Sequence, residues 1–259
     1  MRAGAMTGKP SLKRPQLADV TLVAVSSVAV RQTVAALQQS MRQADFGRVL
    51  LLSDQPPPAD TDPAIGWRRI ERIASRAAYS RFMLKELIKH IDTKHALCVQ
   101  WDGFVLNGCA WDPGFLEYDY IGAVWPQFTD GHNVGNGGFS LRSTRLLEAC
   151  VDLPVDSGAA EDLIIARVCR TRLEQQGVRF APEPVARRFA YERTAPTGNE
   201  YGFHGAFNLV EHLSPPDAFQ LFKTLEPGML ARSERIELLR WALVRGHFKL
   251  MAAMLMRLA

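Results

Sequence analysis

The first hundred residues alternate between short apolar runs and a segment of helical periodicity. The runs VTLVAVSS at 20–27 and FGRVLLLSD at 46–54 are aliphatic and β-branched, which is typical of strands buried on both faces. Between them, residues 30–44 carry apolar side chains at helical spacing. This strand–helix–strand order predicts a doubly wound α/β domain with a mostly parallel sheet flanked by helices.

The chain continues this alternation as far as residue 100 and then departs from it. We expect a Pro-rich loop, a long amphipathic helix and a third strand, in turn at 55–63, 71–91 and 95–100. The aromatic and Gly-rich stretch at 111–140 predicts an irregular strand and a mobile loop. Further elements are expected beyond it: a strand at 138–143 leading into a helix, a helix at 161–177, a strand pair at 178–192 and a loop at 198–205.

Domain boundaries follow from where the periodic pattern begins and where it becomes wholly helical. Residues 1–17 are basic and lack an apolar core, so they predict a disordered leader and not a secretory signal. We expect the α/β domain at 18–214. A helical C-terminal appendage is expected at 215–259, with breaks around Pro227 and Gly246.

The composition fits one globular domain and argues against a nucleic-acid partner. Of the 259 residues, 47% are hydrophobic and 22% are charged, which is ordinary for a protein with a sizeable core. The net charge of +4 suits phosphorylated small molecules or an anionic membrane surface. Nucleic-acid binders usually concentrate more positive charge and interleave it with aromatic residues.

Cysteine usage and the lengths of the apolar runs indicate a compartment. The four cysteines show no CxxC or zinc-type spacing and are expected to be buried free thiols, which favours a reducing environment. No stretch approaches the ~20 consecutive apolar residues of a membrane span. The sequence therefore predicts a cytoplasmic protein.

Asp102 lies just past the predicted strand at 95–100, in the sequence QWDG. In open α/β sheets, ligands bind beyond the carboxyl ends of the strands. Carboxylates are preferred ligands of Mg²⁺ and Mn²⁺, and Gly103 permits a tight turn around an ion. Asp102 is therefore a candidate metal ligand. The alternative is that it caps a turn or the next helix.

The segment VGNGGFSLRS at 134–143 places three glycines within four positions, which allows a ligand to approach the backbone closely. It lacks both the closing Lys-Ser/Thr of a P-loop and the GxGxxG spacing. Gly137 and Gly138 are candidate substrate-binding residues, and Asn136 is a candidate to hydrogen-bond a hydroxyl. Arg142 is expected to face a phosphate or a nearby acid. A plain hairpin loop is the alternative.

Two adjacent acids, Glu161 and Asp162, open the helix predicted at 161–177. Acids at this position often cap a helix N-terminus. The functional alternative is a general base that deprotonates an acceptor hydroxyl. Asp162, with the shorter side chain, is the preferred catalytic candidate and Glu161 is the second.

His204 lies between glycines in the sequence GFHG at 202–205, on a predicted loop. Neutral imidazole is a good ligand for Mn²⁺ and a good partner for a phosphate. The alternative is a histidine that serves packing or lies at the surface. The other histidines show no HxH or HExxH spacing, which argues against a zinc hydrolase.

Taken in order, QWDG, YDYIGAVW with VGNGGFSLRS, EDL and GFHG resemble a bacterial glycosyltransferase-like family of uncharacterised function, found in polysaccharide and glycan gene clusters. The motifs also resemble the general plan of GT-A glycosyltransferases. The resemblance covers roughly 20–205, and 118–143 is its most specific part. It implies a GT-A-like, Rossmann-like fold that transfers a sugar from a nucleotide-diphosphate donor to a hydroxyl of a glycan or lipid-linked acceptor.

The resemblance implies a metal site. GT-A enzymes hold Mn²⁺ or Mg²⁺ on the donor diphosphate with an Asp-x-Asp motif after a central strand. Gln100, Trp101 and Asp102 fall at this position, with glutamine in place of the first acid and the last acid kept as the metal ligand. His204 matches the late histidine that often completes the metal site.

The resemblance also implies the base and the nucleotide site. Inverting members use a carboxylate at the start of a helix as general base, and Asp162 falls at that position. Ser26 and Ser27, at the end of the first strand, fall where the nucleotide usually lies. The Gly-rich loop resembles the acceptor-side loop of such enzymes.

Two other functions share the same sheet and acids. A nucleotidyltransferase usually carries a Gly-rich, Lys/Arg-containing loop after the first strand, whereas residues 25–32 read VSSVAVRQ. A non-catalytic carbohydrate-binding or assembly module is the second alternative, because Gln100 replaces an expected acid.

The final segment at 233–259 mixes arginine and lysine with leucine, tryptophan, phenylalanine and methionine. One interpretation is an amphipathic helix that contacts an anionic membrane peripherally. The other is a helix or helical pair that packs on the domain or forms a dimer contact.

Overall fold

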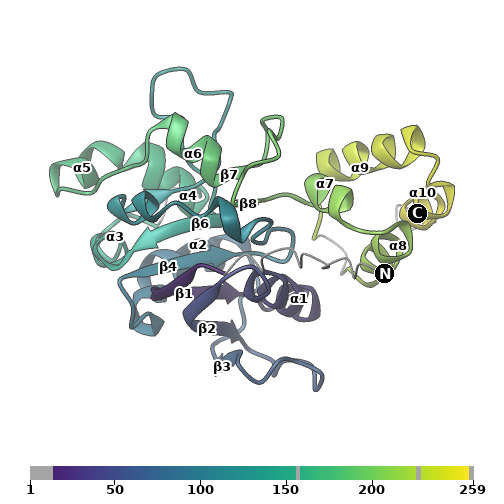
Figure 1. Ribbon diagram of the computed structural model, residues 1–259, viewed down its shortest axis with the longest axis horizontal. Helices are drawn as coiled ribbons and strands as arrows, with labels where there is room; N and C mark the ends of the chain where they lie inside the picture. The colour runs from purple at the N-terminus through teal and green to yellow at the C-terminus, as the bar shows by residue number, and fades with distance from the viewer. Residues whose placement is uncertain (1–13, 156–157, 226–228, 257–259) are drawn as a thin grey trace, which may run out of the picture.

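A computed structural model describes residues 14–155, 158–225 and 229–256. Its centre is a six-stranded sheet in the order β3-β2-β1-β4-β6-β5, with helices on both faces and a group of helices to one side (Figure 1). The predicted α/β class is confirmed, including the mostly parallel, Rossmann-like sheet and the helical appendage.

The parallel strands form the centre and one edge of the sheet. β1 (Gln16–Val25) lies between β2 (Asp45–Ser53) and β4 (His95–Val99), and β3 (Gly66–Arg69) pairs with β2. On the other side, β6 (Phe139–Ser143) runs antiparallel to β4, and β5 (Tyr120–Ile121) runs antiparallel to β6. The parallel strands therefore present their carboxyl ends at one edge.

Successive residues of β1 pack on opposite faces of the sheet. Leu22 joins a core cluster with α1 (Val30–Met41), whereas Val23 joins another with α2 (Arg76–Lys85). A strand buried on both faces needs no polar alternation, and for this reason the sequence reads as a continuous apolar run. The edge strand β3 has no such run and was not predicted.

The predicted helix at 71–91 is shorter and divided. α2 begins after Ser75, whose side chain accepts the N–H of Ala78 at 3.1 Å, and a 3₁₀ helix at Leu87–His90 follows. Further 3₁₀ helices at Gly108–Ala110 and Pro113–Glu117 occupy the aromatic region before β5.

α3 (Thr144–Cys150) follows β6 as predicted. The helix expected at 161–177 is also divided. It consists of α4 (Glu161–Leu163), a π-helical turn at Ile164–Val168 and α5 (Arg170–Gln175). Single π turns occur often beside functional sites, and this one follows the two adjacent acids directly.

The strand pair expected at 178–192 is wrong. α6 (Glu183–Phe189) occupies the middle of this segment. A proline at its N-cap and another in its first turn favour a helix start, and Glu183 pairs with Arg187 one turn later at 2.6 Å. These local signals favour a helix over the predicted strands.

A two-stranded parallel sheet follows, made by β7 (Ala190–Tyr191) and β8 (Gly202–Phe203). Tyr191 pairs with Phe203, so the residues that come next, Glu192 and His204, leave the two strands side by side. This small sheet brings together side chains that are twelve positions apart in the chain.

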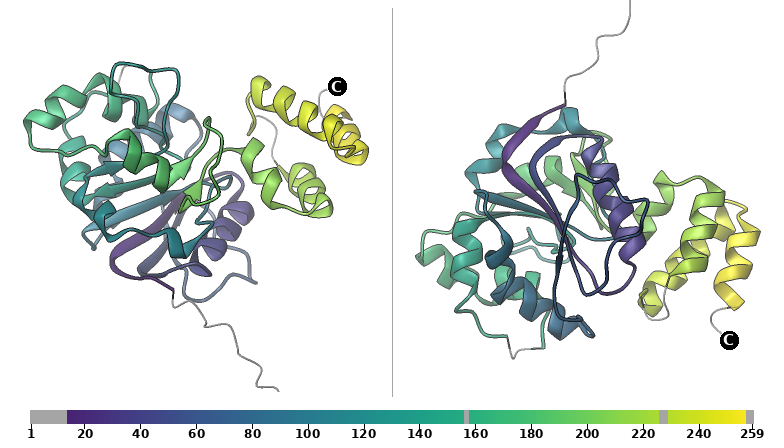
Figure 2. Two further views of the ribbon diagram at one scale, coloured as in Figure 1. Left: turned by 45° about the horizontal axis from the view of Figure 1, so that its top comes forward. Right: turned by 90° about the horizontal axis from the view of Figure 1, so that it is seen from below.

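The predicted appendage contains α8 (Pro215–Thr224), α9 (Arg232–Val244) and α10 (Phe248–Met256). Two elements that precede its predicted start at 215 pack with it and are counted with it below, namely α7 (Ala206–Leu209) and a 3₁₀ helix at Val210–His212. Figure 2 shows these helices beside the sheet domain, and they share a core cluster with Ala29 of the turn after β1. The predicted break at Gly246 is present, with φ 70°. Pro227 and residues 1–13 lie outside the described residues, and β1 already begins at Gln16.

Within the described ranges, none of the helices has the length and apolar character needed to cross a membrane.

Candidate active site

A cleft of about 580 Å³ opens at the carboxyl edge of β1 and β4. Its walls come from the turns after β1 and β4, the start of α2, the Gly-rich loop, the start of α4, the ends of β7 and β8, and the appendage. Every candidate residue except Arg142 lines the cleft: Ser26, Ser27, Gln100, Trp101, Asp102, Asn136, Gly137, Gly138, Glu161, Asp162 and His204.

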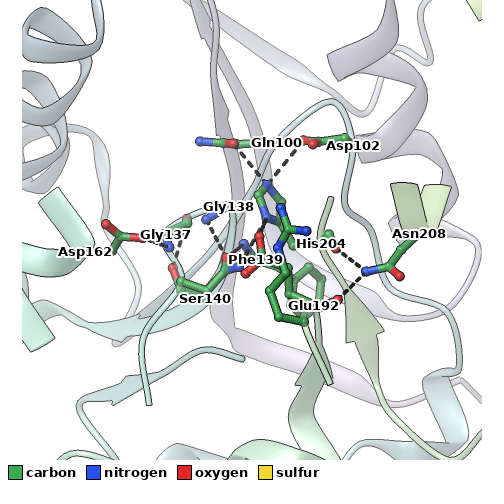
Figure 3. A network of polar contacts seen from close by, with 12 residues as sticks. Gln100, Asp102, Gly137, Gly138, Phe139, Ser140, Asp162, Glu192, His204 and Asn208 are labelled. Atoms are coloured by element: carbon green, nitrogen blue, oxygen red, sulfur yellow. Dashed lines mark hydrogen bonds and ion pairs between the residues drawn. The ribbon is translucent and has the colours of Figure 1, made fainter. Parts of the chain in front are cut away.

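Asp102 and His204 meet at the centre of this cleft (Figure 3). His204 Nε2 lies 3.3 Å from Asp102 Oδ1, and both side chains are largely buried. Gly103 makes the approach possible, because a Cβ there would lie only 2.6 Å from the carbonyl oxygen of Phe203. Two residues that are far apart in the sequence, both predicted as metal ligands, are thus adjacent.

Glu192 holds the other side of the His204 ring. His204 Nδ1 lies 3.0 Å from Glu192 Oε1 (Figure 3). The amide of Asn208 donates to the backbone carbonyls of both residues, at 2.9 Å and 2.7 Å, and so ties the ends of β7 and β8 together. A carboxylate on Nδ1–H fixes the ring orientation and directs Nε2 toward Asp102.

His204 lies between the carboxylates of Asp102 and Glu192, which favour a positive charge on its ring. Burial opposes the charged form of His204, but the carboxylates of Asp102 and Glu192 outweigh it and raise the pKa of His204 well above its ordinary value. Burial would also raise the pKa of Glu192, whereas hydrogen bonds from His204 and Asn136, together with the His204 charge, lower it below its ordinary value. The two neighbouring carboxylates therefore favour the protonated form of the His204 ring.

The side-chain carbonyl oxygen of Gln100 also faces His204 Nε2. Its Nε2 donates to the Tyr79 hydroxyl at 3.0 Å, which leaves Oε1 facing His204 Nε2 at 3.2 Å. Tyr79, from α2, therefore fixes which end of the amide faces the cleft. The glutamine that replaces an acid of the Asp-x-Asp motif still supplies an oxygen here.

These atoms fit a divalent cation that also takes ligands from substrate and water. Asp102 Oδ1 is buried and makes no hydrogen bond of standard geometry, and its polar neighbour is His204 Nε2 at 3.3 Å, although polar atoms in protein interiors are usually satisfied. Mg²⁺ commonly binds one or two carboxylates, several waters and the phosphates of a substrate. No group of three or more His, Cys, Asp or Glu side chains in the described parts is arranged to hold a metal. The protein would therefore provide only part of a coordination shell.

The Gly-rich loop packs tightly against the catalytic candidates. A Cβ at Gly138 would lie 2.0 Å from His204 Nε2, and one at Gly137 would lie 2.1 Å from Glu161 Oε1. Asn136 adopts φ 74°, and its Oδ1 accepts the N–H groups of Gly138 and Phe139 at 2.9 and 3.1 Å. The glycines thus make room for other side chains of the site, and Asn136 folds the loop.

Asp162 faces the cleft from the first turn of α4. Its oxygens accept the N–H groups of Gly137 at 2.9 Å and of Leu163 at 2.8 Å. Burial and the neighbouring charge of Glu161 raise the pKa of Asp162 to about 6, against the opposing effect of these hydrogen bonds. A carboxyl group that titrates near the working pH suits proton transfer.

Arg142 lies outside the cleft and is fully buried. Its Nη2 donates to Glu161 Oε1 at 3.0 Å, and its Nε donates to Ser140 Oγ at 3.0 Å. Of the two partners expected for Arg142, a phosphate or a nearby acid, the structure shows the acid. Glu161 is held in this ion pair, whereas Asp162 has no cationic partner in the described parts of the chain.

The turn after β1 forms the opposite wall with the start of α2. The Ser27 hydroxyl accepts the N–H of Ile73 at 2.8 Å, and the Ser26 hydroxyl donates to the carbonyl of Val28. The exposed side chain of Arg76 and the side chain of Trp101 also line this part of the cleft.

The sequence prediction missed Glu192 and Tyr79. Glu192 ends the segment in which strands are predicted, so it has the same sequence signal as Asp102, an acid close to the end of a predicted strand. Tyr79 carried no signal, because its role depends on how α2 packs beside β4.

A model of a protein family of unknown function, DUF5672, matches residues 68–204, which is more than half of the chain. The chain belongs to this family. The match contains Gln100, Asp102, Asp162, Glu192 and His204. The turn after β1 and the helical appendage lie outside it. None of the curated proteins matches this sequence.

Two solved structures similar to this one are glycosyltransferases. One is described as involved in glycosylation of the major capsid of PBCV-1, with 13% identity, TM-score 0.46, and coverage of 74% of this chain and 98% of that chain. The other is the galactosyltransferase LgtC with donor and acceptor sugar analogues, with 12% identity, TM-score 0.47, and coverage of 84% and 99%. Both similarities concern the fold alone.

Proposed function

We propose that this protein is a metal-assisted glycosyltransferase, which moves a sugar from a nucleotide-diphosphate donor to a hydroxyl of a glycan or lipid-linked acceptor. One observation carries the proposal. A single cleft holds the adjacent Asp102 and His204 and, separately, a carboxylate, Asp162, with its pKa raised to about 6. The order of the sequence motifs supports the same conclusion, and bacterial polysaccharide or glycan assembly is the proposed setting.

Asp102 and His204 would hold Mn²⁺ or Mg²⁺, and the Gln100 carbonyl would add an oxygen. When bound, such an ion stabilises negative charge that develops on a leaving diphosphate. Glu192 acts as a positioning residue that keeps Nε2 of His204 directed at Asp102. Ser26 and Ser27, on the wall formed by the turn after β1, are proposed to contact the nucleotide.

Asp162 is proposed to receive the proton of the acceptor hydroxyl as that oxygen bonds to the anomeric carbon of the sugar. The bond from this carbon to the diphosphate oxygen breaks in the same step, and the diphosphate leaves with the electron pair. The carboxylate must be ionised to act, and inversion is the expected outcome. The Gly137 N–H bond orients the carboxylate toward the cleft.

The proposal is tested by measuring thermal shifts and turnover with UDP-, GDP-, CMP- and dTDP-sugars, each with and without Mn²⁺. A ligand that binds the folded state raises the melting temperature by mass action. We expect one nucleotide class to raise it in the presence of Mn²⁺, and the same donor to be hydrolysed slowly without an acceptor. Binding without turnover toward any acceptor would favour the inert carbohydrate-binding module, and the absence of any shift would overturn the proposal.

The pH profile of the wild-type enzyme is expected to follow Asp162. Because the pKa of Asp162 in the free protein is about 6, kcat/KM should fall about tenfold for each pH unit below that value. Above it, kcat/KM should level off as the base becomes fully ionised. Initial rates across the acidic range test this, and a flat profile through pH 6 would contradict the assigned base.

Replacing Glu192 should weaken metal binding without touching the metal directly. We expect Glu192→Ala to reduce Mn²⁺ affinity about 10–100-fold, because the carboxylate no longer orients the His204 ring. Glu192→Gln, which keeps an acceptor for Nδ1–H, should show a smaller loss. Mn²⁺ titration followed by electron paramagnetic resonance measures both.

The matched control for Glu192 is Glu183→Gln. Glu183 also accepts side-chain hydrogen bonds, from Asn133 and Arg187, but it does not line the cleft. Its replacement should leave Mn²⁺ affinity unchanged. Equal affinity in Glu192→Ala and in the wild type would show that the carboxylate has no role in positioning the histidine.

A further inference from the structure

The outward side of α9 and the turn into α10 expose an unusual amount of apolar surface. Ile236, Leu243, Val244 and Phe248 are 42%, 56%, 84% and 62% exposed. We call these four residues, with the neighbouring Arg240 and Lys249, the α9–α10 face. In the described residues, only three other large hydrophobic side chains are exposed, and they are scattered: Trp67, Val151 and Val168.

The helical geometry gathers these residues on one side. Ile236, Arg240, Leu243 and Val244 are spaced by four, three and one positions, which places them along one face of α9. The opposite side of α9 carries the buried Leu238 and Ala242, which pack in the core of the appendage with α8 and α10. The apolar residues of the outward side are therefore not needed for folding the appendage.

The charges around this face are predominantly positive. Two acids near this face already have partners: Glu237 pairs with Arg193 at 3.0 Å, and Glu211 pairs with Arg245 at 2.9 Å. Glu234 accepts the N–H of Ala231.

The remaining cations of α9 and α10 lack such partners. In the described parts of the chain, Arg232, Arg240 and Lys249 have no carboxylate partner, and all three are exposed. The face therefore combines unpaired positive charge with exposed leucine, valine and phenylalanine.

We propose that the α9–α10 face docks on an anionic lipid bilayer surface. Apolar side chains flanked by lysine and arginine bind at the boundary between headgroups and acyl chains, where both contributions are favourable. A symmetric contact with a second copy of this chain would bring the same unpaired cations together, which opposes association. The charge complementarity thus favours lipid over self-association.

The same appendage reaches the active-site cleft. Met229 and Glu234, which precede and begin α9, line the cleft, whereas the α9–α10 face points to solvent. Docking through this face would hold the cleft close to the membrane, where a lipid-linked acceptor is found. The docking proposal does not depend on the proposed glycosyl transfer, because vesicle binding requires no turnover.

The test is co-sedimentation of the full chain with vesicles of phosphatidylcholine alone or with about 30% phosphatidylglycerol. We expect binding to the anionic vesicles only, and a marked loss between about 0.1 M and about 0.5 M NaCl. Arg240→Gln with Lys249→Gln should lower the partition coefficient about 30-fold, from the usual contribution of a basic residue near such a surface. Val244→Ser with Phe248→Ser should lower it about tenfold or more.

The matched control is Val168→Ser, because Val168 is 62% exposed, as Phe248 is, but lies on the π-helical turn before α5. It should bind vesicles as the wild type does. Equal binding to both kinds of vesicle, no binding to either, or variants that bind unchanged would overturn the proposal. Sedimentation velocity supplies the remaining outcome, since a dimer that Val244→Ser with Phe248→Ser dissociates would assign this face to a second copy.

Discussion

Asp102→Asn is expected to lower metal-dependent kcat/KM by about 10²–10³-fold or more, because the proposed ion would lose its carboxylate ligand. Asparagine keeps the size of the side chain, and Glu192 still balances the charge of His204, so the fold should persist. Mn²⁺ titration should show weakened binding in the same variant. The two measurements together separate loss of the metal from loss of the fold.

Asp54→Asn is the matched control for this prediction. Asp54 comes directly after the parallel strand β2, and Asp102 lies three residues after the end of β4, but Asp54 does not line the cleft. Its replacement should change kcat/KM by no more than about twofold. Retention of wild-type rates in Asp102→Asn would remove the metal ligand from the mechanism, and equal losses in both variants would point to a stability effect.

Asp162→Asn is expected to remove activity and raise stability together. Loss of the general base should reduce kcat by about 10²–10⁴-fold. The pKa of Asp162 in the folded protein, about 6, lies above its ordinary 3.8, so ionisation disfavours the folded state. The stability that the protonated form of Asp162 contributes is fully present below about pH 3.8, and it is lost as the pH rises through about 6.

At about pH 8, therefore, the wild-type protein carries a poorly solvated charge at Asp162 that the variant lacks. Since Asp162 is partly exposed, solvent reduces the effect, and we expect a gain of roughly 1–3 kcal/mol in the variant. Thermal unfolding at about pH 8 and about pH 4 measures it, because the gain should vanish at the lower value. An unchanged or lower melting temperature at the higher pH, with full activity, would show that Asp162 is an ordinary helix cap.

The sequence was informative where burial on both faces leaves a continuous apolar run. β1, β2 and β4 carry such runs, and their carboxyl ends place Ser26 and Asp102 at one edge of the sheet. β3 has the sequence GWRR and no buried residue, so no apolar pattern marks it. α6 shows the opposite case, because the segment predicted as a strand pair carries helix-start signals, a proline at the N-cap and another in the first turn.

The candidate site was predictable as a set of residues but not as a set of contacts. Asp102, Asp162 and His204 were identified from their positions after strands, at helix starts and between glycines, and the structure places all three in one cleft. The pairing of Glu192 with His204 depends on the short β7–β8 sheet, which two-residue strands do not reveal in a sequence. The burial of Arg142 against Glu161 is likewise a product of tertiary packing.

Trp101 gives the appendage a mechanical connection to the site. It packs against the core cluster of the helical appendage, and the next residue along the chain is Asp102. A displacement of the helices would therefore reach Asp102, the proposed metal ligand, through a single peptide unit. Thermodynamic reciprocity then requires that, if occupancy of the cleft shifts the appendage, engagement of the appendage changes affinity in the cleft by the same factor. Membrane binding by the appendage and donor binding in the cleft would then each strengthen or weaken the other.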